Sequence, residues 1–425
     1  SKLERIREIM KENGCNAHVL SSLDDIAWLL NIRGNDIAYC PLVLSYAIVY
    51  NNSVELFADI RKFSDDIINL LAENQVKIYP YEDIYRKVSE MTSEDKLLLD
   101  STIMNYSLYQ AISKETVIVD KQNPEILMKS VKNETQTENL RKAHLKDAVA
   151  HTKFMYWLKK NIGRVEITEL SASARLEGLR AEQEHFLGPS FGPISAYGEH
   201  GAIVHYSADE KSNVPLKEGK LFMTDTGGHY LEGSTDITRT VALGEVGNIE
   251  KEHFTLVARA MLRLANTVFL YGCSGANLDC IAREVFWKEG LNFNHGTGHG
   301  VGYLLNIHEG PINFRWKEGE RPAPALEENM VITDEPGIYI EGSHGIRLEN
   351  ELLVRKTVKN EYGQFMNFEI LTYVPIDLDA ILPEKMSTEE KEMLNHYHKQ
   401  VYEKVSPYLS EEERIWLKEY TRAVK

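Results

Sequence analysis

The chain has 425 residues, of which 43% are hydrophobic and 26% charged, and its formal net charge is −16. This length favours two or three domains, and the lack of any basic block argues against a nucleic-acid partner. No apolar run approaches the roughly 18 residues that a membrane span needs, so we predict a protein that binds neither nucleic acid nor membrane.

The cysteines and the first residue bear on cellular context. Cys15, Cys40, Cys273 and Cys280 are too scattered for a disulfide framework or a thiolate zinc site, which favours free thiols in a reducing cytoplasm. The chain opens on Ser1 rather than on a methionine, which is typical of an expressed fragment or a processed product.

The first 120 residues alternate helical and strand patterns. Residues 1–14 have the periodicity of an amphipathic helix that ends at Gly14. Two apolar runs, 42–50 and 54–59, are separated by turn residues and predict a hairpin. We therefore predict an α/β domain over residues 1–122. Its other expected elements are a helix over 63–74 and strands over 18–22, 76–80, 96–100 and 116–120.

A polar segment over 120–135, which carries Pro124, marks the expected domain boundary. We predict a second domain over 123–365 in which helices cover a largely antiparallel sheet, followed by a mostly helical, charged extension over 366–425. The helices are expected over 134–162, 167–184 and 251–269, and the strands over 191–198, 201–206, 221–225, 239–244, 330–334 and 351–356.

One short pattern occurs twice in the second domain. TDTGGHY (224–230) and TDEPGIY (333–339) share the frame T-D-x-x-G-x-Y, and each follows an apolar strand. Each is followed by another acidic residue 11 to 14 positions on. The two matches are either chance or the mark of two related halves that face each other.

Five side chains in these frames form a candidate metal-ligand set: Asp225, Asp236, His299, Glu335 and Glu349. Hairpins would bring each pair of acids to one end of the sheet. The set is rich in oxygen and lacks thiolates, which suits manganese, or cobalt or zinc. Four carboxylates are neutralised by two divalent cations, and buried unpaired carboxylates are costly. A solvated acidic rim beside a core histidine explains any one of these residues, but the five together favour a two-metal site.

Competing catalytic motifs are not met. GTGHGVG lacks the last glycine of a G-x-G-x-x-G loop. GCSGA is not a G-x-S-x-G nucleophile elbow, and HEGPI is not H-E-x-x-H. Dinucleotide-binding and serine-hydrolase functions are therefore excluded.

The motifs resemble those of metallopeptidase family M24, which includes aminopeptidase P, prolidase and methionine aminopeptidase. The resemblance is carried by DTGGHYLEGSTDITRT, HGTGHGVGYLLNIHEGP, TDEPGIY, GIRLEN, GAIVHY and DDIAWLLNIRG, in that family's order and spacing. The nine-residue step from His299 to His308 points to the cytosolic eukaryote-like branch of aminopeptidase P. The resemblance implies an RNase H-like creatinase-N domain followed by a pita-bread catalytic domain with two pseudo-symmetric halves. It also implies that the chain lacks the first of that branch's two N-terminal domains.

The resemblance implies a role for each of the five ligands. Asp225 would bind one metal ion, Asp236 and Glu349 would bridge both ions, and His299 and Glu335 would complete the second site. A water or hydroxide shared between the ions would be the nucleophile. Glu335 would shuttle its proton to the leaving nitrogen.

The resemblance also implies four substrate contacts. His205 and His308 would contact the substrate around the scissile carbonyl and stabilise the oxyanion. His295 would line the pocket for proline, and Arg347 would hold a ligand carboxylate or a peptide carbonyl. A packing histidine and a structural ion pair are the alternatives for the last two residues. Tyr339 is expected to support the site.

We therefore predict an Xaa-Pro aminopeptidase with two divalent ions, manganese being favoured. Prolidase, which cleaves only dipeptides, is the alternative within the family. A catalytically inactive relative that binds a partner is disfavoured because all five ligand positions are filled. The expected partners are peptides with proline in second position and a second copy of the chain, in the cytoplasm.

Overall fold

The computed structural model describes residues 1–317, 319 and 322–425. It contains two compact units, Ser1–Lys129 and Ser130–Lys425. No helix in these described ranges is both long and apolar enough to cross a bilayer.

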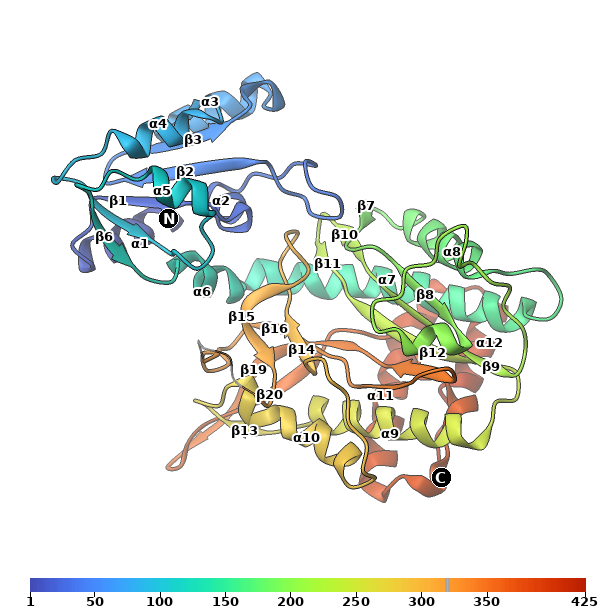
Figure 1. The fold of residues 1–425 in the computed structure, drawn as a ribbon. Helices are drawn as coiled ribbons and strands as arrows, with labels where there is room; N and C mark the ends of the chain where they lie inside the picture. Colours follow the sequence, from blue (N-terminus) through green and yellow to red (C-terminus); the bar gives the residue numbers. More distant parts are fainter. Residues whose placement is uncertain (318, 320–321) are drawn as a thin grey trace. The chain divides into compact units, whose positions relative to one another are not determined.

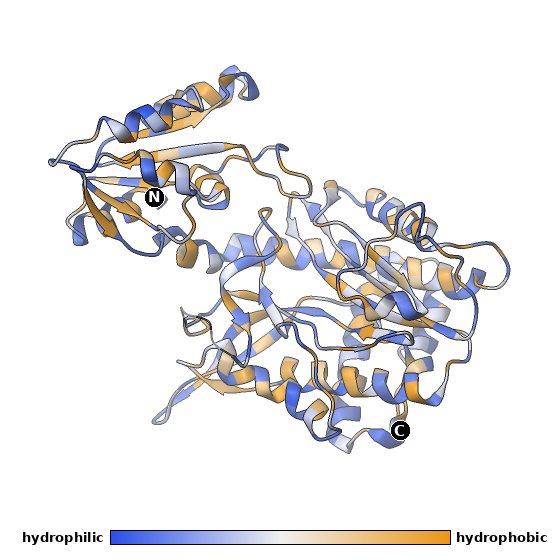
Figure 2. Ribbon diagram, in the orientation of Figure 1, coloured by the Kyte–Doolittle hydropathy of each residue, from blue (hydrophilic) through white to orange (hydrophobic). Residues whose placement is uncertain are grey.

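The first unit is built on one mixed sheet with the strand order β4-β3-β2-β1-β5-β6. Strands β2 and β3 form the predicted hairpin, in which Val49 pairs with Val54, and β1 continues on the other side of β2. Parts of these strands are coloured as hydrophobic in Figure 2, and their buried apolar residues form the core of an α/β unit, as predicted. Its elements are α1 (Lys2–Glu12), β1 (Ala17–Leu20), α2 (Leu23–Leu30), β2 (Ser45–Tyr50), β3 (Val54–Ala58), α3 (Asp65–Glu73), β4 (Val76–Tyr79), α4 (Asp83–Ser89), β5 (Lys96–Leu99), α5 (Tyr106–Ala111) and β6 (Val117–Asp120).

The second unit follows the helix α6 (Pro124–Ser130) and begins with the 28-residue helix α7 (Glu134–Asn161). A reciprocal capping box between Asn133 and Gln136 starts α7, because each side chain accepts the other residue's backbone N–H. The remaining helices are α8 (Glu169–Ala181), α9 (Asn248–Ala265), α10 (Gly275–Trp287), α11 (Thr388–Val405) and α12 (Glu411–Tyr420).

The strands of this unit pair in antiparallel fashion and lie between α7 and α8 on one side and α9 and α10 on the other (Figure 1). One sheet has the order β12-β9-β8 and another the order β13-β20-β19-β16-β14-β15. The prediction of helices covering a largely antiparallel sheet is confirmed. The strands are β7 (Phe186–Pro189), β8 (Ile194–Tyr197), β9 (Lys220–Thr226), β10 (Gly228–Tyr230), β11 (Gly233–Ser234), β12 (Ile237–Leu243), β13 (Phe269–Leu270), β14 (Gly298–Gly300), β15 (Glu309–Phe314), β16 (Val331–Asp334), β17 (Gly337–Ile340), β18 (His344–Arg347), β19 (Asn350–Asn360) and β20 (Gly363–Ile370).

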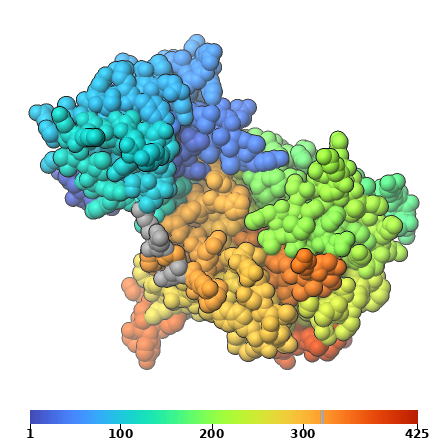
Figure 3. Space-filling view, viewed as in Figure 1, coloured from blue at the N-terminus to red at the C-terminus, as the bar shows by residue number. Residues whose placement is uncertain are grey.

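The two T-D-x-x-G-x-Y frames have the same local structure. In each, a strand of the main sheets (β9 or β16) ends near the acid, and a short strand (β10 or β17) follows after one or two residues. The space-filling view shows the surface of the first half (green) directly beside that of the second half (yellow and orange) (Figure 3). The repeated frame therefore marks two similar halves that pack side by side.

Several segments differ from the sequence-based expectation, and α2, α4 and α5 of the first unit are among the elements that were not predicted. The run 201–206 was expected as a strand, but Gly198–Ala202 forms a 3-10 helix, η2, and His205 lies in the segment after it. Gly198 has a φ of +57°, and Gly201 packs against the backbone of Gly345, so the chain turns where the apolar pattern suggested extension. The expected linker contains α6, and α10 was not predicted.

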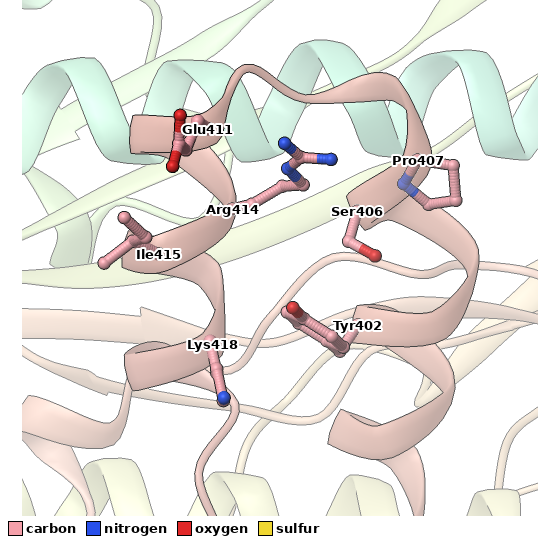
Figure 4. A pocket seen from close by; sticks show the side chains of 7 residues that line it. All are labelled: Tyr402, Ser406, Pro407, Glu411, Arg414, Ile415 and Lys418. Carbon is pink, nitrogen blue, oxygen red and sulfur yellow. The ribbon is translucent and has the colours of Figure 1, made fainter.

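The C-terminal extension is helical, as expected. A pocket of about 470 Å³ lies between its helices, with Tyr402 and Ser406 facing Arg414 and Lys418 (Figure 4). None of the candidate ligand residues lines this pocket.

Candidate metal centre

The five candidate ligands come from strand ends that the two sheets bring together. Asp225 lies next to the end of β9, and Asp236 immediately precedes β12; the rung that pairs Thr226 with Ile237 joins these strands. The second pair repeats this arrangement. Asp334 pairs with Asn350, so Glu335 and Glu349 flank the last rung between β16 and β19.

The ligand atoms of these residues form overlapping groups whose members all lie within 4.8 Å of one another. Asp236, His299 and Glu349 each belong to two groups. The Nε2 atom of His299 lies 3.5 Å from Asp236 Oδ2 and 3.6 Å from Glu335 Oε1. The groups are Asp225 with Asp236 and Glu349, His299 with Glu335 and Glu349, and Asp236 with His299 and His308.

His299 is held in the tautomer that a metal ligand requires. Its Nδ1 lies 3.0 Å from the carbonyl oxygen of Gly300, which accepts only, so Nδ1 carries the proton. The lone pair of Nε2 therefore points toward the acids. The backbone N–H of His299 donates to Thr333 Oγ1 at 3.0 Å and fixes the strand beneath the ring.

The acids of the cluster are buried close together, which disfavours their ionised forms. Burial, followed by the charge of the neighbouring acids, raises the pKa values of Asp236 and Glu349 well above their usual range. Burial also raises the pKa of Glu335. The Oδ1 atom of Asp225 is buried and has no hydrogen-bond partner in the described part of the chain. A buried, mutually repelling, oxygen-rich set with one imidazole nitrogen fits two divalent cations.

Arg347 is committed to partners inside the protein. Its guanidinium donates to Asp225 Oδ2 through Nε at 3.1 Å and through Nη2 at 2.5 Å, and through Nη1 to the hydroxyl of Tyr339 at 2.8 Å. Its side chain is only 2% exposed. This geometry favours the structural ion pair that was the alternative for Arg347. The expected contact with a ligand carboxylate or a peptide carbonyl stays a prediction.

Tyr339 links Arg347 to His295. The Nδ1 atom of His295 lies 2.7 Å from the carbonyl oxygen of Gly296, so Nε2 accepts from the Tyr339 hydroxyl at 2.8 Å. Burial lowers the pKa of His295 to about 4, so the ring is neutral at neutral pH. A hydrogen-bonded chain thus runs from Asp225 through Arg347 and Tyr339 to His295.

His205 and His308 lie at the exposed side of the cluster. The ring of His308 is centred 4.4 Å from that of His299. His205 lies close enough to His308 and His295 to contribute to the lowering of the pKa of both rings, which burial causes in the first place. The structure thus brings all the predicted site residues into one region of the second unit.

Other polar residues beside the ligands were not predicted. Thr238 Oγ1 donates to Glu349 Oε2 at 2.8 Å. Glu351 Oε1 accepts the backbone N–H of Asp236 at 2.7 Å, and His144 Nε2 lies 3.1 Å from Glu351 Oε2. The partners in these contacts are more than 100 residues apart in the sequence, so no local pattern marks them.

Comparison with known proteins identifies the family of this fold and site. The model of metallopeptidase family M24 matches residues 138–356, and the model of the C-terminal region of peptidase M24 matches 364–424. The chain belongs to metallopeptidase family M24.

The model of the creatinase/prolidase N-terminal domain matches residues 1–136. The predicted fold class, a creatinase-N domain followed by a pita-bread catalytic domain, is confirmed. The expected lack of the first N-terminal domain is wrong, because this match places the family's N-terminal domain in the chain.

Relatives of this M24 chain align with nearly all of it. Aminopeptidase P1 of Arabidopsis thaliana is 34% identical over 100% of the chain and 73% of its own length. A probable Xaa-Pro aminopeptidase P of Ajellomyces capsulatus is 36% identical over 100% of the chain and 72% of its own length.

A solved structure has the same fold. The X-prolyl aminopeptidase of Caenorhabditis elegans, described as a cytosolic enzyme with a di-nuclear active site, superposes with a TM-score of 0.93. It is 34% identical, over 100% of this chain and 70% of that one.

Proposed function

We propose that this metallopeptidase hydrolyses the peptide bond between an N-terminal residue and a following proline. The observation that carries the proposal is the convergence of four carboxylates and one correctly oriented imidazole in the M24 domain. The relatives named Xaa-Pro aminopeptidase support the choice of substrate.

Asp225, Asp236, His299, Glu335 and Glu349 would hold two divalent cations, for which manganese is a fitting choice. Bound cations would polarise the scissile carbonyl and lower the pKa of a water molecule in the site. We assign Asp236 and Glu349 to both ions, because each belongs to two of the ligand groups and a carboxylate offers two oxygens, whereas His299 offers only one free ring nitrogen.

Glu335 is proposed to move the proton. In the described part of the chain its carboxylate has one hydrogen bond, a long one of 3.3 Å from Thr333 Oγ1. Its raised pKa brings the carboxyl group closer to the pH at which it works, which favours accepting a proton from water and releasing it to the leaving nitrogen.

The histidines on the exposed side are proposed to contact the substrate. We assign His205 and His308 to the scissile carbonyl, where a hydrogen bond to the developing oxyanion stabilises the transition state. Neutral His295, fixed by Tyr339, is proposed to form a wall for the proline ring. Arg347 is proposed to act indirectly, by holding Asp225.

Three further features are proposed from the sequence and from family membership. They are a homodimer, a cytoplasmic location, and division of the chain into 1–122, 123–365 and 366–425. Equilibrium sedimentation of the purified chain tests the dimer.

Product analysis by mass spectrometry tests the function. The Mn²⁺-loaded protein is incubated with Ala-Pro-Ala and, separately, with Ala-Pro, beside a chelator-treated control. We expect release of alanine from the tripeptide and its loss on chelation. Cleavage of the dipeptide alone would make the protein a prolidase, and no cleavage of either would contradict the proposal.

A further inference from the structure

Glu351 is a buried acid close to the metal centre that the proposed chemistry does not use. It lies on β19 two residues after Glu349, and its side chain is 0% exposed. Its backbone is fixed, since its N–H donates to Thr372 Oγ1 at 2.9 Å and its carbonyl accepts the N–H of Leu371 at 2.9 Å. The backbone from which the carboxylate extends is therefore held by contacts with residues 371 and 372.

That carboxylate holds the backbone of a candidate ligand. Glu351 Oε1 accepts the N–H of Asp236 at 2.7 Å. Its second oxygen lies 3.1 Å from Nε2 of His144, a fully buried residue on α7. Glu351 thus lies between the ligand loop and the long helix behind it.

The residue before Asp236 is held by the same face of α7. Thr235 Oγ1 donates to Asp147 Oδ2 at 2.6 Å, and Asp147 follows His144 at the i+3 spacing that places both on one side of a helix. The carbonyl of Thr235 accepts from Ser190 Oγ at 2.8 Å. The side chain and carbonyl of Thr235 and the backbone N–H of Asp236 are therefore held by hydrogen bonds.

A fifth buried carboxylate beside four others adds repulsion to the cluster, so its presence calls for a compensating role. We propose that Glu351 is a positioning residue that fixes the backbone of Asp236 and thereby sets the affinity of the site for its second divalent cation. This inference rests on the proposed two-metal site. Asp236 belongs to two ligand groups, so a shift of its backbone would disturb both.

Two substitutions at Glu351 distinguish the effect of side-chain length from the effect of charge. Glu351→Asp keeps the charge but withdraws the carboxylate by one methylene, so it no longer reaches the Asp236 N–H. Glu351→Gln loses the charge but keeps an oxygen at the right distance. Asp377→Glu is the matched control, because Asp377 Oδ2 accepts another buried N–H of β12, that of Ala242, at 2.8 Å.

The readout is calorimetric titration of the metal-free full chain with Mn²⁺, followed by kcat and KM for Ala-Pro-Ala. We expect Glu351→Asp to weaken the second Mn²⁺ site by about 10- to 100-fold and to lower kcat, with KM nearly unchanged. Glu351→Gln should retain both sites within a few-fold of the wild type. Asp377→Glu should lower the midpoint of unfolding without changing either site.

The inference would be overturned if Glu351→Asp bound two Mn²⁺ ions with wild-type affinity. An equal loss of Mn²⁺ affinity in Asp377→Glu would also overturn it. A greater loss of Mn²⁺ affinity in Glu351→Gln than in Glu351→Asp would overturn it as well, because the charge of the side chain rather than its length would then matter. Measurements on the wild type distinguish a failure of the proposed function from a failure of this inference. A wild-type chain that binds two Mn²⁺ ions but cleaves no peptide refutes the activity, while the titrations still decide the role of Glu351.

Discussion

The acids of the metal centre differ in what holds them. Asp225 is fixed by the guanidinium of Arg347, and Glu349 accepts from Thr238. Glu335 has one long hydrogen bond in the described part of the chain. A ligand that must also exchange a proton needs this freedom, which supports the proposal that Glu335 moves the proton.

Glu335→Ala tests this assignment at the scale of one residue. We expect kcat/KM for Ala-Pro-Ala to fall by at least about 10²- to 10⁴-fold, because the variant loses its proton shuttle. The fold should persist, as judged by circular dichroism, since the side chain makes few contacts. Glu341→Ala, which removes an exposed acid from the nearby turn, is the control and should retain activity. Normal activity in Glu335→Ala would contradict the proposed mechanism.

At the scale of elements, the site depends on a close contact between η2 and β18. A Cβ atom added to Gly345 would lie 1.6 Å from the carbonyl oxygen of Gly201. The two segments can approach this closely only because both residues are glycines. Arg347 lies two residues after Gly345, and His205 lies four residues after Gly201, so we expect this contact to set the spacing between the ion pair and the exposed histidine.

Gly345→Ala should therefore separate η2 from β18. We expect a loss of about 1–3 kcal/mol in the free energy of unfolding and a lower kcat/KM, measured by urea denaturation and peptide hydrolysis. Gly178→Ala on α8 is the matched control: no atom lies within 4 Å of its added Cβ, and helix propensity predicts a small gain in stability. Equal stabilities of the two variants would show that the contact is not tight in solution.

At the scale of the whole molecule, the acid cluster couples metal binding to stability and pH. In the metal-free protein the pKa values of Asp236 and Glu349 are raised above those of the unfolded chain, first by burial. The folded state therefore binds more protons than the unfolded state, and the metal-free cluster becomes less destabilising as pH falls through these raised pKa values. Cations bind the ionised carboxylates and displace those protons.

The rise in Tm caused by Mn²⁺ should consequently be largest near pH 8 and shrink toward pH 5. At a 100-fold excess over Kd, binding contributes about 2.7 kcal/mol, or roughly 5 °C in Tm. Scanning calorimetry of loaded and chelated protein at both pH values measures it. The double variant Asp236→Asn with Glu349→Gln should show no such rise. An equal rise in the wild type at both pH values would contradict the linkage.

Local patterns in the sequence predicted the main elements and the candidate ligands. The hairpin of β2 and β3, the helix α7 and the strands β9 and β16, which end at Thr226 and Asp334, follow from periodicity and turn residues within a few positions. Acids at strand ends are visible because the strand and the acid are adjacent in the chain. The run 201–206 was misread because the contact that bends it comes from Gly345, far along the sequence.

The sequence by itself therefore predicted the candidate ligand set and the family to which its motifs point, and the repeated frame left two related halves as one of two interpretations. Only the tertiary structure decided which groups hold those ligands. Asp236 meets Glu351 across 115 residues, and Asp225 meets Arg347 across 122. A hydrogen bond is sensitive to changes of a few tenths of an ångström in the donor–acceptor distance. The packing of the sheets and helices of the second unit sets these distances. Residue spacing along the chain carries no such information, which is why the structure was needed to find Glu351 and His144.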